Sequence, residues 1–145
     1  MSTVPARSPL PDPWNTPVGV KLLDYKKMLK EILKQVQPNL DPKEFRRKDL
    51  ESHMRQLDTI RDYMDRIMNI ARHKPVLEQC LKSAVAVREQ VAEARRQMWS
   101  ASPLVDTIHS STATPARQRE SAVELDKALE ICRSSLKGAI DQFRA

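Results

Sequence analysis

The chain has 145 residues, is 30% charged with a net charge of +6 at pH 7, and holds only two glycines. β-Sandwiches and barrels need Gly-rich turns and strands rich in aromatic and β-branched residues, so a chain with two Trp, two Tyr and two Phe is not expected to form one. No stretch approaches the roughly 18 apolar residues of a transmembrane helix, and the composition predicts a soluble, nearly all-helical protein.

The first 17 residues form a distinct N-terminal arm with five prolines and one arginine. Proline lacks an N–H and disfavours helix in the residue before it, so residues 1–17 are predicted to be extended. The arm has neither the apolar run of a secretory signal nor the Arg-rich pattern of a transit peptide. We therefore expect an intracellular, cytoplasmic protein, located in the cytosol or associated with the cytoskeleton.

Four segments with helical periodicity follow the arm. Apolar residues recur every three or four positions in each of them, which is typical of amphipathic helices. Asp41 and Pro42 are the expected start of the second helix, because Asp caps a helix N-terminus and proline suits its first position. The predicted helices are residues 18–37, 42–73, 76–99 and 115–143.

The lengths of the connections predict how these helices are arranged. Short breaks separate the first three helices, so residues 18–99 are expected to form an antiparallel three-helix unit. Residues 100–114 are rich in Ser and Thr and are predicted to be a linker, followed by a C-terminal amphipathic helix over residues 115–145. That helix either closes the fourth side of the unit or packs on a partner. The predicted fold is all-α, an antiparallel three- to four-helix bundle with long heptad-patterned helices.

The third and fourth predicted helices have the most regular heptad patterns, and each pattern includes one cysteine. Free cysteine behaves as a small buried hydrophobe. We therefore expect Cys80 and Cys132 to be shielded in seams that face each other or a partner helix. The two seams are Leu77, Cys80, Ala84, Val87, Val91, Ala94 and Met98, and Ala122, Leu125, Leu129, Cys132, Leu136, Ala139 and Phe143.

The sequence contains no pattern that points to catalysis or to a metal. Its three histidines, His53, His73 and His109, are scattered, without a His pair on one helical turn or a Cys–His cluster. Gly19 and Gly138 cannot supply the Gly-rich loop of a phosphate site or a nucleophile elbow. We expect no enzymatic activity and no cofactor.

A basic triplet, Arg46-Arg47-Lys48, stands near the start of the second predicted helix. Acidic neighbours such as Glu44 and Asp49 favour a solvated helix start, and the alternative is a patch for phosphate or for an acidic partner. Acids and bases alternate along this helix, whereas nucleic-acid-binding surfaces concentrate one sign of charge. A basic helical nucleic-acid-binding protein is therefore an alternative function, and nucleic acid is not the partner that we expect.

The arm carries two large apolar residues, Leu10 and Trp14, with Asp12 and Pro13 before the tryptophan. A tryptophan in a stiff, Pro-rich segment suits docking into a groove on a partner. The alternative is that Trp14 folds back over the first helix. The Asp-Pro-Trp triplet also resembles the short DPW peptides that clathrin-adaptor appendage domains bind. On the docking hypothesis the arm becomes ordered only on a partner.

Four Ser/Thr-Pro dipeptides fall outside the predicted helices or at their ends. They are candidate sites for proline-directed phosphorylation, which adds about −1.5 to −2 charges near a helix start. The alternative is ordinary loop and capping chemistry. The candidate phosphosites are Ser8, Thr16, Ser102 and Thr114.

Residues 12–98 resemble the N-terminal three-helix domain of syntaxins, in their Asp-Pro-aromatic start and in the lengths of the three helices. The resemblance implies a trafficking module, and without a following zipper-plus-anchor segment we do not expect a membrane-anchored SNARE. The function that we favour is a non-enzymatic interaction or structural subunit of a multi-subunit protein assembly. It would bind other proteins through its helix seams and its arm.

Overall fold

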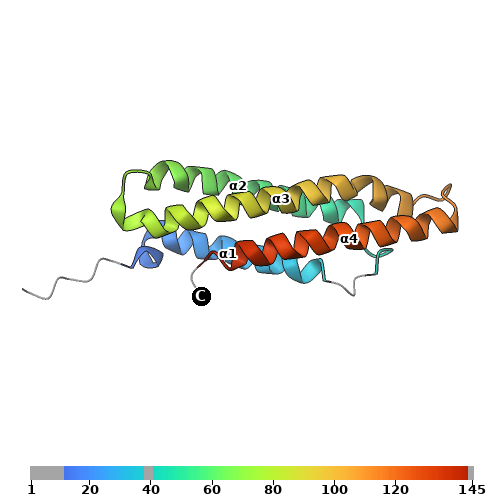
Figure 1. The fold of residues 1–145 in the computed structure, drawn as a ribbon, viewed down its shortest axis with the longest axis horizontal. Helices are drawn as coiled ribbons and strands as arrows, with labels where there is room; N and C mark the ends of the chain where they lie inside the picture. Colours follow the sequence, from blue (N-terminus) through green and yellow to red (C-terminus); the bar gives the residue numbers. More distant parts are fainter. Residues whose placement is uncertain (1–11, 38–40, 144–145) are drawn as a thin grey trace, which may run out of the picture.

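A computed structural model of the protein describes residues 12–37 and 41–143. Of these residues 83% are helical, and none of them lies in a β-strand. Four long helices pack against one another in an elongated molecule (Figure 1). They are α1 (Pro17–Gln35), α2 (Arg47–Ala71), α3 (Glu78–Ile108) and α4 (Pro115–Ile140), with single 3-10 turns η1 (Pro13–Asn15) before α1 and η2 (Pro75–Leu77) before α3. The all-helical prediction is confirmed.

Helix α3 lies at the centre of the packing and has its most extensive contacts with α4 and then with α2 (Figure 1). The thiol of Cys132 on α4 donates to the carbonyl oxygen of Ala94 on α3 at 3.3 Å. Ion pairs join α2 to α3, and their order places the start of α2 beside the end of α3. These pairs are Arg47 with Asp106, Asp58 with Arg95 and Asp65 with Arg88.

The core follows the predicted seams closely. Every residue of the seam predicted for the third helix is buried. In the seam predicted for the fourth helix, every residue is buried except Ala122, which is half-buried. Cys80 and Cys132 are both free thiols with no exposed surface. Of the two predicted alternatives, that the seams face each other or a partner helix, the α3–α4 contacts show the first.

The end of α3 corrects the predicted linker, because residues 100–108 continue the helix. Pro103 stands inside α3 and has no N–H, so it cannot bond the carbonyl of Trp99 four residues before it. Buried Val105 and Ile108 extend the seam past the proline. This burial offsets the cost of the lost backbone bond. Only the short segment between α3 and α4 remains a connection.

The start of α2 is also later than predicted. Asp41–Glu44 form a turn rather than the first turn of the helix, and α2 begins at Arg47, where the Asp49 carboxylate accepts from the backbone N–H of Arg46 at 3.0 Å. The turn carries Phe45 into the core, where its side chain is buried. Burying an aromatic side chain stabilises the fold more than one further exposed helical turn would.

The N-terminal segment corrects the prediction of an extended arm up to residue 17. Residues 1–11 lie outside the described residues, but Trp14 sits in the η1 turn and is buried in the core of the chain itself. The Asp12 carboxylate accepts from the backbone N–H of Trp14 at 3.0 Å, and the Thr16 hydroxyl accepts from Gly19 at 3.1 Å. The fold-back alternative for Trp14 is therefore the one that the structure adopts.

The contact of η1 with α1 depends on Gly19, and the two glycines of the chain make a matched test. A Cβ at Gly19 would collide with the backbone of Pro13 and Trp14, whereas a Cβ at Gly138 meets only the flexible side chain of Gln90, at 3.3 Å. Gly19→Ala is expected to lower the free energy of unfolding by about 1–3 kcal/mol. Gly138→Ala should raise it by up to about 1 kcal/mol, because Ala favours helix. Urea denaturation of both variants measures this, and equal effects would contradict the close packing of η1 against Gly19.

Candidate functional site

The predicted partner-binding residues of the arm form part of the chain's own core. Leu10 lies outside the described residues. Asp12 caps η1, and the carbonyl oxygen of Pro13 accepts from Thr16 at 2.5 Å and from the thiol of Cys80 at 3.6 Å. The indole of Trp14 is 7% exposed. The structure therefore brings Asp12, Pro13 and Trp14 together as a staple over the start of α3, and Trp14 offers no free surface to a peptide-binding groove.

The candidate phosphosites have unequal access. Ser8 lies outside the described residues. Thr16 and Thr114 are the N-cap residues of α1 and α4, and the Thr114 hydroxyl accepts from the backbone N–H of Arg117 at 3.2 Å. Ser102 is buried within α3 and donates to the carbonyl of Met98 at 3.4 Å. Ser102 is therefore shielded in the folded chain, whereas Thr114 is exposed.

The predicted basic patch is exposed but partly neutralised. Arg47 bonds Glu51 at 3.1 Å and Asp106 of α3 at 2.6 Å. The hydrogen bond to Glu51 and the charge of Asp106 raise the pKa of Arg47, so its charge is fixed by carboxylates of the same chain. Arg46 and Lys48 are exposed, and neither side-chain cation has a carboxylate within 4.0 Å among the described residues. The patch therefore offers two unpaired cations rather than three.

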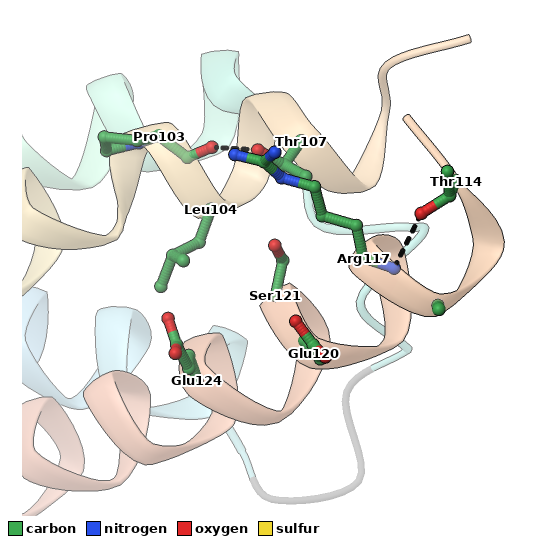
Figure 2. Close-up of a pocket in the computed structure, with 9 residues that line it drawn as sticks. Pro103, Leu104, Thr107, Thr114, Arg117, Glu120, Ser121 and Glu124 are labelled. Carbon is green, nitrogen blue, oxygen red and sulfur yellow. Dashed lines mark hydrogen bonds between the residues drawn. The ribbon is translucent and has the colours of Figure 1, made fainter. Parts of the chain in front are cut away.

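A pocket of about 490 Å³ lies where the end of α3 meets the start of α4. Figure 2 shows Glu120, Ser121 and Glu124 of α4 facing Leu104 of α3, with the side chain of Arg117 reaching toward Thr107. No histidine or cysteine lines this pocket. Among the described residues, no group of three His, Cys, Asp or Glu side chains could hold a metal ion.

Two buried polar side chains, Arg133 of α4 and His53 of α2, contact other parts of the same chain. The guanidinium of Arg133, 7% exposed, donates to the carbonyl oxygen of Val36 at 2.9 Å and so binds α4 to the end of α1. His53 is stacked on Phe45, with ring centroids 6.2 Å apart, and its Nδ1 has no hydrogen-bond partner among the described residues. Burial lowers the pKa of His53, so the ring is neutral at pH 7.

The most exposed large apolar side chain among the described residues is Trp99 on α3, at 62%. The guanidinium of Arg95 lies over its ring, 6.0 Å from the centroid, and bonds Asp58 of α2 at 2.8 Å. The next ion pair along the two helices joins Arg47 to Asp106. We call this stretch, made of Trp99, Arg95, Asp58, Arg47 and Asp106, the Trp99 surface. On this surface the Trp99 indole lies between two ion pairs that join α2 to α3.

Sequence reasoning missed this surface, because Trp99 is not part of the heptad seam of the third predicted helix. Trp99 follows Met98 of the seam by one residue, a rotation of about 100° around the helix, which takes it out of the core. The basic neighbours Arg95 and Arg96 and the polar Ser100 were the available signal.

Comparisons with known proteins identify no relative: no protein-family model, no curated protein and no solved structure matches the chain. None of the described helices has the length and apolar character needed to cross a membrane.

The neutral, buried His53 predicts a pH dependence of stability. Its folded pKa lies below the ordinary value of 6.5, so the unfolded chain binds the proton more readily and stability falls as the pH drops from 7 to 5. His53→Leu should flatten this part of the profile, whereas His73→Gln, at an exposed position, should leave it unchanged. Denaturant titrations at pH 7, 6 and 5 measure the slope. An unchanged slope in His53→Leu would show that another group causes it.

The two thiols are predicted to respond differently to loss of the staple. Burial raises the pKa of Cys132 to about 12 and also raises the pKa of Cys80, so both should react slowly with a bulky maleimide in the native protein. Trp14→Ala should speed the reaction of Cys80, which lies against Pro13, and leave Cys132 slow. Mass spectrometry of time points in single-cysteine variants measures both rates. Equal acceleration of the two thiols would mean that Trp14 supports the whole fold rather than one end.

Proposed function

We propose that this chain is a non-enzymatic interaction subunit of a larger protein assembly and that it binds another protein through the Trp99 surface. The observation that carries the proposal is the 62% exposure of Trp99 on a rigid helix. Tryptophan and arginine are enriched among the residues that contribute most to protein–protein binding. Here the two occur together, because Arg95 lies over the Trp99 ring.

The energetic argument rests on the area of the indole. A tryptophan buries about 150–250 Å², and each Å² of apolar area removed from water contributes about 25 cal/mol. A partner that covers the exposed part of Trp99 therefore gains roughly 3 kcal/mol, about a hundredfold in affinity. The ion pairs on either side already fix their side chains, so less conformational entropy is lost on binding.

The scaffold that we propose for this surface is an antiparallel four-helix bundle. The ion pairs of α2 with α3 run in opposite residue order, and so do the pairs Cys132 with Ala94 and Gln142 with Ser83 between α4 and α3. The colours of Figure 1 follow the same reversals. Such a bundle holds the Trp99 surface on two long helices rather than on a loop.

Two features bear on the alternatives and on location. Burial of Trp14 argues against an adaptor-binding module that would use the Asp-Pro-Trp triplet. Buried free thiols are typical of the reducing interior of the cell, which supports our proposal of a cytoplasmic location.

The test compares two exposed apolar positions of similar accessibility. Trp99→Ser should abolish co-purification of the partner from extract of the source cells, and the matched variant Val123→Ser, 57% exposed on α4, should retain it. Both positions are exposed, so each variant should stay within about 0.5 kcal/mol of the parent in stability. Affinity purification with quantitative mass spectrometry measures the recovery. Retention of every partner by Trp99→Ser would reject the proposal.

A further inference from the structure

We infer that the Trp99 surface binds an acidic amphipathic helix of a partner protein, whose apolar side chain covers Trp99 while its carboxylates pair with Lys48 and Arg55 of α2. The inference rests on the proposed function and adds the chemistry of the partner.

The first step is the distribution of unpaired charge around Trp99. Four of the five carboxylates of α2 are paired with a cation of this chain: Glu51 with Arg47, Asp58 with Arg95, Asp62 with Arg61 and Asp65 with Arg88. The fifth, Asp49, accepts from the backbone N–H of Arg46. On the neighbouring part of α3, Glu93 bonds Arg96 and Asp106 bonds Arg47. By contrast, Lys48 and Arg55 are exposed and have no carboxylate within 4.0 Å among the described residues. The charge left for a partner here is positive.

The second step is the position of these cations relative to the indole. The pairs Arg47 with Asp106 and Asp58 with Arg95 fix the register of the two helices, which places Trp99 level with residues 54–55 of α2. Lys48 and Arg55 are seven residues apart, so they lie on one face of α2 about 10 Å from each other. Two acidic residues seven positions apart on a partner helix have the same spacing, and an apolar residue about level with the one that pairs with Arg55 would lie beside Trp99.

The third step distinguishes this ligand from nucleic acid. An aromatic ring beside basic residues also suits a single-stranded nucleic acid, which stacks its bases and pairs its phosphates. A phosphate backbone, however, would pass the carboxylates of Glu51, Asp58 and Asp106, which are exposed or half-buried on the same surface. Arg47 and Arg95 are committed to these carboxylates. A peptide can place its few carboxylates at Lys48 and Arg55 and apolar groups elsewhere, so the surface favours the peptide.

The same charges disfavour a second copy of this chain. An isologous contact through the Trp99 surface repeats Lys48 and Arg55 on both sides of the interface. The unpaired charges of the two copies are then all positive, and no free carboxylate of this surface compensates them.

The test uses the full chain and a pair of synthetic helical peptides. One carries a Leu stripe flanked by Glu residues seven positions apart, and its twin has Lys in place of each Glu. Calorimetric titration should show that the Glu peptide binds, with an affinity that falls as the salt concentration rises. The Lys peptide should bind at least tenfold more weakly. Trp99→Ser should weaken the Glu peptide by about a hundredfold.

Charge reversal identifies the cations. The double variant Lys48→Glu/Arg55→Glu should bind the Glu peptide about tenfold more weakly and should now prefer the Lys peptide. The control is Arg119→Glu on α4, an exposed arginine away from this surface, which should change nothing. Circular dichroism confirms that each variant is folded.

Four outcomes would overturn the inference: no binding of the Glu peptide, equal binding of the two peptides, tighter binding of an oligo(dT) strand, or dimerisation in sedimentation that Trp99→Ser abolishes. If the peptide experiments fail while Trp99→Ser still loses the cellular partner, only the chemistry of the partner is wrong. If Trp99→Ser keeps the partner, the proposed function itself fails.

Discussion

Helix α3 carries a core seam that is longer than the helix α1 packed beside it can cover. With 31 residues α3 is about 46 Å long, whereas α1 has 19 residues and covers only about 28 Å of that length. The core beyond α1 is completed by single aromatic residues from irregular segments. Trp14 closes one end, near Cys80, and Phe45 closes the other, near His53 and His109.

Burial of Trp14 and Phe45 explains the turn that precedes α1 and the late start of α2 after it. Trp14 reaches the core only because Gly19 lets the η1 turn lie against α1. Asp12 accepts from the backbone N–H of Trp14 in that turn, and Thr16 accepts from the backbone N–H of Gly19 at the start of α1. Phe45 reaches the core only because α2 begins at Arg47, one turn later than predicted. The carbonyl oxygen of Phe45 accepts from His109 Nε2 at 2.9 Å. At Phe45 burial of the aromatic ring outweighs local helix propensity, and at Trp14 it outweighs the extended conformation that the prolines favour.

The two tryptophans differ because of what surrounds them in space. Trp14 has an uncovered part of the core to fill, whereas Trp99 lies on the outer side of a seam that Met98 already fills. Ion pairs between α2 and α3 then hold the polar side chains beside Trp99 in place. An exposed ring between fixed charges is costly to leave in water and inexpensive to cover, which is why our functional proposals centre on it.

The all-helical class, the four helical segments and the core seams follow from the sequence, because heptad spacing depends only on neighbours along the chain. The continuation of α3 through Pro103, the late start of α2, the burial of Trp14 and the exposure of Trp99 follow from packing between distant segments. Propensity counts Pro103 as a helix breaker and Pro42 as a helix starter, but buried Val105, Ile108 and Phe45 reverse both outcomes. Burial depends on which helices meet and on where α1 ends. The ion pair of Arg47 with Asp106 likewise joins residues that are 59 positions apart in the sequence. Local pattern does not contain that information.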